Sequence, residues 1–174
     1  MFQTKRLIIR PFTPEDVADV YDLRSDSAIM RFIREPQSFV EAESWVKMVS
    51  SKWETQKLGF AGVFRPDTEE LIGWCGLWVL TESGEIEVGY AIKQEYWRKG
   101  YASEAAFEVL NYGFNELKLE KIVAVADPKN IGSINVMKKI GMKFVKFGNF
   151  YGKELIQYGI SKEQYDRNRA IKNV

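Results

Sequence analysis

The stretch YWRKGYASEAAFEVL, residues 96–110, decides the fold because it joins a strand-like segment to a helix-like one. The preceding residues 85–93 alternate between apolar side chains and acidic or small ones, which predicts a strand. The following residues repeat apolar and small side chains at helical spacing as far as Leu117, which predicts a helix lying close to a sheet. The turn between them carries the basic pair and the glycine of residues 98–100. This order favours an anion-binding site at the start of the helix.

The residues of this turn suit phosphate. The first N–H groups of a helix have no partners within the helix, and the helix dipole adds partial positive charge there. Gly100 lets the backbone approach a ligand closely, and the small Ala102 keeps the first helical turn open. Arg98 and Lys99 add positive charge beside the turn. Glu104 lies in the first turn of the helix, and we expect its side chain to point away from the phosphates. The alternative is a solvated turn whose basic residues serve only solubility.

The composition is that of a soluble globular protein, and we expect residues 1–174 to form one domain. Hydrophobic residues make up 45% of the chain and charged residues 28%, which is ordinary for this class. The net charge of +1 gives no electrostatic basis for binding nucleic acid or a membrane. The single cysteine, Cys75, permits no intrachain disulfide, and the first residues lack signal-peptide anatomy. We therefore expect a cytoplasmic protein.

The chain contains no histidine, which restricts its chemistry. Ser-His-Asp and Cys-His arrangements are excluded. Most transition-metal sites are excluded as well, since only one cysteine accompanies the carboxylates, and we expect no metal. Any acid–base catalysis must fall to Glu, Asp, Lys, Tyr, Ser, a water molecule or the substrate.

The order of the expected elements is β-α-α-β-β-β-α-β-α-β-β, which predicts a mixed α/β (α+β) sheet with helices on both faces. The segments 85–117 and 121–140 are expected to be parallel crossovers, with a ligand at the carboxyl ends of their strands. The expected strands are residues 6–12, 59–65, 71–80, 85–93, 121–126, 142–147 and 154–160. The expected helices are residues 14–25, 38–55, 101–117 and 133–140, with a polar helix at the end.

Four segments in this order resemble the GCN5-related N-acetyltransferases (GNAT), and more closely their RimJ/RimL-like subgroup. They are KRLIIRPF at 5–12, EVGYAI at 87–92, YWRKGYASEA at 96–105 and NIGSINVMKKIGM at 130–142. The superfamily has an R/Q-x-x-G-x-G/A loop, in which Trp97 here replaces the first residue. The resemblance implies a GNAT-like fold with a central mixed, mostly antiparallel sheet.

The resemblance also implies how acetyl-CoA is bound. The loop would hold its pyrophosphate through Arg98, Lys99, Gly100, Tyr101 and Ala102. The backbone of the preceding strand would pair with the pantetheine arm as another strand would, at Ala91, Ile92 and Lys93. The alternative is that this strand edge simply pairs with the next strand.

Asn130 and Ser133 form the N-x-x-S element of the subgroup. Asn130 is expected to contact the cofactor and Ser133 to hydrogen-bond the thioester sulfur, although both residues are also good helix caps. The resemblance places Met137 at the position of the tyrosine acid that many members of the superfamily use, which favours Ser133 or no dedicated acid. The N–H of Ile92 is a candidate to hold the oxyanion.

Glu87 is the expected general base, because the subgroup has a carboxylate there and a partly buried Glu can accept a proton. The open alternative is that Glu87 faces solvent or pairs with a basic residue. Glu85 is a second, weaker candidate.

The implied reaction is acetyl transfer from acetyl-CoA to a primary amine, either a protein N-terminal α-amine, such as that of a ribosomal protein, or a small molecule. Phe32, Trp53 and Tyr151 are expected to line the acceptor pocket. The subgroup makes a homodimer plausible. The alternative function is a non-catalytic sensor or scaffold that binds acyl-CoA.

Overall fold

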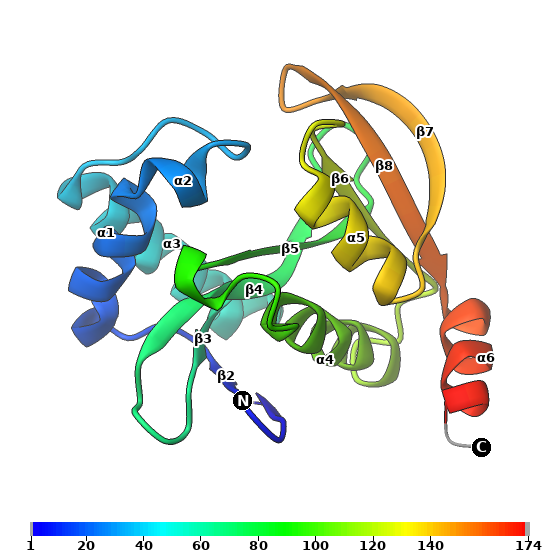
Figure 1. Cartoon of the computed structure of the whole chain (residues 1–174), viewed down its shortest axis with the longest axis horizontal. Helices are drawn as coiled ribbons and strands as arrows, with labels where there is room; N and C mark the ends of the chain where they lie inside the picture. The colour runs from blue at the N-terminus through cyan, green and yellow to red at the C-terminus, as the bar shows by residue number, and fades with distance from the viewer. Residues whose placement is uncertain (1, 173–174) are drawn as a thin grey trace. The chain divides into compact units, whose positions relative to one another are not determined.

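The eight strands form one mixed sheet in the order β1-β2-β3-β4-β5-β6-β8-β7 (Figure 1). The computed structural model describes residues 2–172. Strands β5 and β6 are parallel, whereas β1–β2, β2–β3, β6–β8 and β7–β8 are antiparallel, as expected for a mostly antiparallel sheet. The strands are β1 Phe2–Gln3, β2 Ile8–Arg10, β3 Gly59–Phe64, β4 Leu71–Val79, β5 Ile86–Ile92, β6 Lys121–Ala126, β7 Lys143–Phe150 and β8 Lys153–Ser161.

The helices alternate with these strands along the chain. They are η1 Pro14–Asp16, α1 Val17–Ser25, α2 Ser27–Met30, α3 Phe39–Gln56, η2 Gln94–Tyr96, α4 Tyr101–Asn115, α5 Ile131–Lys139 and α6 Lys162–Lys172. The chain divides into two compact units, one of residues 1–76 and 90–105, the other of residues 77–89 and 106–174. The single domain expected over residues 1–174 stays a prediction.

The first unit is built around α3, which packs on α1 and on β3. Ser38 caps α3 and exchanges hydrogen bonds with Glu41, which fixes the predicted start of the helix. The inward face of α3 carries Trp45, whose ring contacts Trp74 of β4 at a centroid distance of 5.7 Å. Arg24 of α1 is buried, and its guanidinium carbon lies 3.9 Å from the centroid of the Trp45 ring. Burial lowers the pKa of the Arg24 guanidinium to about 9. This unit therefore has an aromatic core.

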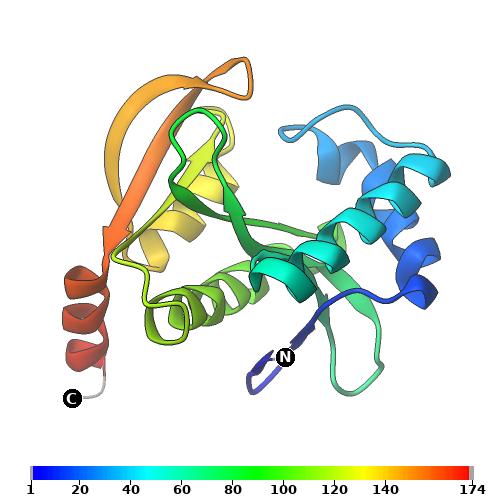
Figure 2. The same ribbon diagram turned by 180° about the vertical axis from the view of Figure 1, so that it is seen from behind.

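The second unit contains the β7–β8 hairpin, with α6 following β8 and α5 packed on β6 (Figures 1 and 2). The predicted hairpin is confirmed, and each strand is longer than expected. Strand β8 pairs with β6 on one side and with β7 on the other. The segment β6–α5–β7 therefore connects strands that run in the same direction but are separated by β8.

Two expected boundaries are corrected, and two elements that the sequence did not predict are added. The strand expected over residues 6–12 is reduced to β2, which pairs with the short β1, an element that the sequence did not predict. The single turn α2 was also not predicted; Asp26 caps it by accepting the N–H groups of Ala28 and Ile29. Helix α5 begins at Ile131 rather than at residue 133 because Asn130 is its N-cap.

Candidate functional site: an anion-binding loop and a buried carboxylate

The loop between η2 and α4 alternates the sign of its backbone angle φ. Arg98 has a φ of 61° and Gly100 a φ of 86°, whereas the neighbouring Lys99 and Tyr101 are not in the positive-φ region. A left-handed non-glycine residue is unfavourable, so Arg98 marks a backbone that the surrounding turn enforces. Alternating right- and left-handed residues turn successive N–H groups toward one side, which makes an anion-binding concavity.

The N–H groups of residues 98–103 donate no hydrogen bond to any residue that the structure describes. The two flanking N–H groups are occupied: Trp97 donates to the carbonyl of Gln94 (3.1 Å) and Glu104 to that of Gly100 (3.0 Å). The row of available amides therefore runs from Arg98 to Ser103 and begins directly after Trp97. Unpaired main-chain donors at a helix start bind an oxyanion.

Arg6 of the N-terminal segment holds this loop in place. Its Nη1 donates to the carbonyl of Lys99 (3.1 Å), and its guanidinium lies over the ring of Tyr101, 4.5 Å from the centroid. Its Nε donates to Glu104 (2.7 Å), which also accepts from the hydroxyl of Thr4 (2.6 Å). Burial raises the pKa of Glu104, but these hydrogen bonds outweigh it and the pKa lies below its ordinary value. The carboxylate of Glu104 is thus bound to Thr4 and Arg6 of the N-terminal segment. The sequence predicts that this side chain points away from a bound anion.

Only part of the β5 edge is free to bind a ligand. The N–H of Lys93 donates to Ile72 of β4 (2.8 Å), and a Cβ at Gly73 of β4 would lie 2.1 Å from the carbonyl oxygen of Ala91. Because alternate residues of a strand point to opposite edges, Ala91 and Lys93 face β4 and Ile92 faces away. The expectation that the backbone of all three residues binds the cofactor is therefore wrong for the N–H of Lys93, and Ile92 presents the opposite edge.

The side chain of Trp97 also occupies part of the β5 edge that faces away from β4. Its Nε1 donates to the carbonyl of Ile92 at 2.6 Å, although the ring is 45% exposed. This contact occupies the carbonyl of Ile92, on the side of β5 that faces away from β4. The sequence placed Trp97 only as an unusual residue in the loop motif, and nothing in its spacing signals a bond to the strand five residues earlier.

Glu87 is a buried carboxylate in the second unit. Only 7% of the residue is exposed, and its Oε1 accepts a hydrogen bond from the hydroxyl of Tyr151 in the β7–β8 turn. Burial raises the pKa of Glu87 to about 7; the hydrogen bond from Tyr151 opposes this shift and the charge of Glu82 adds to it. A carboxylate that titrates near neutral pH can both accept and release a proton under physiological conditions.

Glu85, two residues earlier, has the opposite environment. Its carboxylate accepts from Nζ of Lys121 (2.7 Å) and from Nε2 of Gln157 (2.8 Å). The hydrogen bond from Lys121 is the main reason why the pKa of Glu85 lies below its ordinary value. Glu85 therefore has the features of a structural ion pair, and Glu87 those of a base.

Asn130 and Ser133 are brought together at the start of α5. The side-chain oxygen of Asn130 accepts the N–H of Ser133 at 3.1 Å, so the capping alternative that the sequence left open is realised. Met137, at the position expected for a tyrosine acid, is 1% exposed and belongs to the core. The cofactor roles of Asn130 and Ser133 stay predictions.

The three residues expected in the acceptor pocket have different surroundings. The Nε1 of Trp53 donates to the carbonyl of Phe60 (3.0 Å), and the Trp53 ring packs on Phe2. These contacts within the protein explain why the Trp53 side chain is half-buried. Phe32 follows α2 and lies under the guanidinium of Arg31, 5.2 Å away. Tyr151 contacts another predicted functional residue, since its hydroxyl donates to Glu87.

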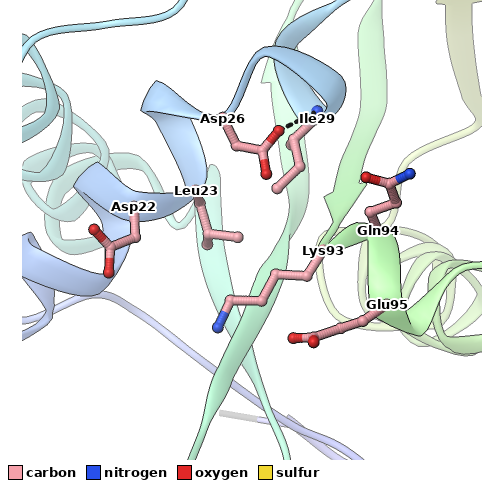
Figure 3. A pocket seen from close by; sticks show the side chains of 7 residues that line it. All are labelled: Asp22, Leu23, Asp26, Ile29, Lys93, Gln94 and Glu95. Atoms are coloured by element: carbon pink, nitrogen blue, oxygen red, sulfur yellow. Dashed lines mark hydrogen bonds between the residues drawn. The ribbon is translucent and has the colours of Figure 1, made fainter.

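A cavity of about 500 Å³ lies elsewhere in the first unit, between α1, α2 and the residues that follow β5 (Figure 3). Lys93 extends across it, and its Nζ binds Glu70 (2.9 Å). The carboxylate of Asp26 is already used to cap α2. The lining contains none of the predicted acceptor residues; it consists of Asp22, Leu23, Asp26, Ile29, Lys93, Gln94 and Glu95.

Residues 2–172 lack two kinds of feature. Within this range no three His, Cys, Asp or Glu side chains are grouped so that they could hold a metal ion. Over the same range, every helix is too short or too polar to cross a bilayer.

Comparison with known proteins identifies relatives over most of the chain. Residues 6–143 match the protein family described as "Acetyltransferase (GNAT) domain". The chain is 39% identical over 140 residues to the uncharacterized N-acetyltransferase YnaD of Bacillus subtilis, an alignment that covers 80% of this chain and 81% of that protein.

Solved structures share the fold. A GNAT-family acetyltransferase from Bacillus anthracis superposes with a TM-score of 0.81 at 28% identity, covering 92% of this chain and 98% of that one. A spermidine N-acetyltransferase from Vibrio cholerae, solved with CoA and spermine, superposes with a TM-score of 0.77 at 20% identity, covering 93% and 99%. At that identity, the second likeness shows the fold alone.

Proposed function

The chain belongs to the GNAT family and is an N-acetyltransferase, and on that premise we propose that it transfers acetyl from acetyl-CoA to a primary amine. Within the family we assign it to the RimJ/RimL-like subgroup, on the four segments that resemble that subgroup. The acceptor is a protein N-terminal α-amine or a small-molecule amine.

The observation that carries this proposal is the row of unpaired N–H groups over residues 98–103. A pyrophosphate matches such a row because its oxygens accept several hydrogen bonds at once, and the helix dipole of α4 adds partial positive charge. The exposed side chains of Arg98 and Lys99 add two positive charges beside it. The loop therefore fits the diphosphate of CoA, with Gly100, Tyr101 and Ala102 contributing main-chain donors.

Other residues are assigned to the rest of the cofactor. The N–H of Ile92, on the edge of β5 that faces away from β4, is proposed to hydrogen-bond the acyl-pantetheine portion. Asn130 and Ser133 keep their proposed contacts with the cofactor, while Asn130 also caps α5 by accepting the N–H of Ser133. When bound, acetyl-CoA supplies an acetyl group activated as a thioester.

Glu87 is the proposed general base. The acceptor amine has to lose a proton to become nucleophilic, and its reference pKa is about 8 for an α-amine and about 10.4 for a lysine side chain. A carboxylate with a pKa of about 7 is well matched to accept a proton from an α-amine near neutral pH, directly or through one water molecule. The acceptors with the lower amine pKa are therefore the better substrates.

The test is a pair of measurements on the purified protein. Acetyl-CoA binding is measured by calorimetry, and thiol release is measured with a panel of amines: spermidine, aminoglycosides, free amino acids and peptides carrying the N-termini of ribosomal proteins. Mass spectrometry then identifies the acetylated nitrogen. Acetyl-CoA binding without thiol release over the whole panel would favour a non-catalytic acyl-CoA sensor, and failure to bind acetyl-CoA would remove both functions.

A further inference from the structure

Tyr151 occupies an unfavourable position in the β7–β8 turn. Tyr151 and Gly152 have φ values of 54° and 71°, the geometry of a two-residue type I′ hairpin turn. Such turns favour Asn-Gly or Gly-Gly, because a bulky residue with positive φ costs about 1–2 kcal/mol. A backbone outlier of this kind points to a role beyond closing the hairpin.

Two hydrogen bonds hold Tyr151 in this conformation. Its main-chain N–H donates to the carboxylate of Glu82 in the β4–β5 turn, and its hydroxyl donates to Oε1 of Glu87 in β5. The Glu82 contact fixes the backbone of the turn and thereby aims the phenol at Glu87. The turn is thus attached to two carboxylates at once, through its main chain and through its side chain.

The charges around Glu87 make the hydroxyl of Tyr151 its main stabilising contact. Glu82 on the β4–β5 turn is negatively charged and disfavours ionisation of Glu87. Glu85, which directly precedes β5, is paired with Lys121 of β6, and no described ion pair includes Glu87. The hydroxyl is therefore the group in this unit that favours the proton-accepting form of Glu87.

We propose that Tyr151 is a positioning residue: its hydroxyl orients the Glu87 carboxylate and holds it in the proton-accepting form. This inference rests on the proposed role of Glu87 as base. Tyr151 engages Oε1, and no described hydrogen bond reaches Oε2, which leaves that oxygen for the proton of the acceptor. A phenol donates such a bond while keeping its own proton, so Tyr151 acts through Glu87 and not on the substrate.

The decisive measurement does not depend on turnover. Glu87 is titrated by carbon NMR with glutamate labelled at the carboxyl carbon, in the absence of acetyl-CoA and acceptor, and Glu87→Gln assigns the resonance. Tyr151→Phe keeps the ring and removes the hydroxyl. Because a hydrogen bond to a charged group contributes roughly 1.5–3 kcal/mol, the titration midpoint should rise by about one pH unit or more.

Tyr158→Phe is the matched control. Tyr158 lies in β8 of the same hairpin and packs on Phe144, so its hydroxyl can be removed without touching the Glu87 contact. In Tyr158→Phe, the titration midpoint of Glu87 should equal that of the wild-type protein. Of these two variants, Tyr151→Phe alone should shift the acid limb of the pH–rate profile to higher pH. The KM for acetyl-CoA should stay unchanged in both.

An unchanged Glu87 midpoint in Tyr151→Phe would overturn the role of Tyr151 and leave the proposed function intact. A shifted midpoint with an unshifted pH–rate profile would overturn Glu87 as the base, and with it the catalytic meaning of the contact. These two failures are therefore distinguishable in the same pair of variants.

Discussion

The loop of residues 98–103 and the Glu87–Tyr151 pair achieve their chemistry in opposite ways. The loop offers main-chain N–H groups that have no partner, on a segment whose Arg98 and Lys99 are exposed. The pair uses two side chains, and its carboxylate is buried and already hydrogen-bonded. The loop should therefore tolerate changes of side chain but not of backbone conformation, whereas the pair should be sensitive to the loss of a single charge or hydroxyl.

The largest effect is expected from Glu87→Gln, which removes the base but keeps the size and burial of the side chain. General bases contribute about 10²–10⁴-fold, so kcat with a primary amine should fall by at least about 100-fold, while acetyl-CoA binding by calorimetry stays the same. Glu85→Gln, at the residue that directly precedes β5, is the matched variant, and its rate should change by no more than a few-fold. If Glu85→Gln were the variant to lose activity, the roles of the two carboxylates would be exchanged.

The same two residues should have opposite effects on stability. The pKa of Glu87 rises on folding from its ordinary 4.5 to about 7, so the folded state binds more protons between these pH values and stability falls as pH rises through this window. The loss amounts to about 3 kcal/mol. Glu87→Gln should therefore be more stable than the wild type at pH 8 and equal to it near pH 4.

Glu85 provides the contrast, since the hydrogen bond from Lys121 lowers its pKa in the folded state. Its contribution is complete above the unfolded pKa and is lost as pH falls through the folded pKa. Glu85→Gln should accordingly be less stable than the wild type at pH 8. Urea unfolding at several pH values measures both variants, and a Glu87→Gln protein destabilised at pH 8 would contradict the assigned burial effect.

Gly100→Ala tests whether the loop depends on backbone conformation. The φ of Gly100 is 86°, a region that costs an alanine about 1–2 kcal/mol, so KM for acetyl-CoA should rise about tenfold. Gly84→Ala carries a similar penalty, because Gly84 has a φ of 71° and open space around it in the β4–β5 turn. It should lower stability without changing KM. If Gly100→Ala and Gly84→Ala had equal KM values for acetyl-CoA, cofactor binding would not depend on the backbone conformation of the loop.

The smallest effect is expected at Arg6, which supports the loop from outside. Arg6→Ala removes the contacts with Glu104 and with the carbonyl of Lys99, and KM for acetyl-CoA should rise about threefold because the loop is less well ordered. Overall stability should change by less than about 1 kcal/mol, since exposed ion pairs contribute little. Lys5→Ala, at the neighbouring exposed position, serves as the control, and a KM change equal to that of Arg6→Ala would indicate a general charge effect.

The loop was largely predictable from sequence, because a strand, a glycine-containing turn and a periodic helix are local patterns. The position of Gly100 and the outward direction of Glu104 follow from helix-start physics. The left-handed Arg98 and the bond from Trp97 to Ile92 were not predictable. Both depend on how the turn folds back on itself, and residue type does not encode that.

The carboxylate pair was predictable only in part. Alternation in β5 placed Glu87 on one face of the strand, but whether that face is covered depends on distant segments. The covering residue, Tyr151, comes from a turn formed by β7 and β8, and its contact with Glu87 has no counterpart in any local pattern. The pairing of β8 with both β6 and β7 likewise could not be deduced from the order of elements alone.

That pairing has a consequence for the chain as it is made by the ribosome. The edge of β6 that faces β8 has no partner strand until residues 153–161 have emerged, although α5 and β7 have already been synthesised. An unpaired strand edge recruits other extended chains. During the interval between the synthesis of β6 and that of β8, this edge of the nascent protein is therefore open to pairing with other extended chains.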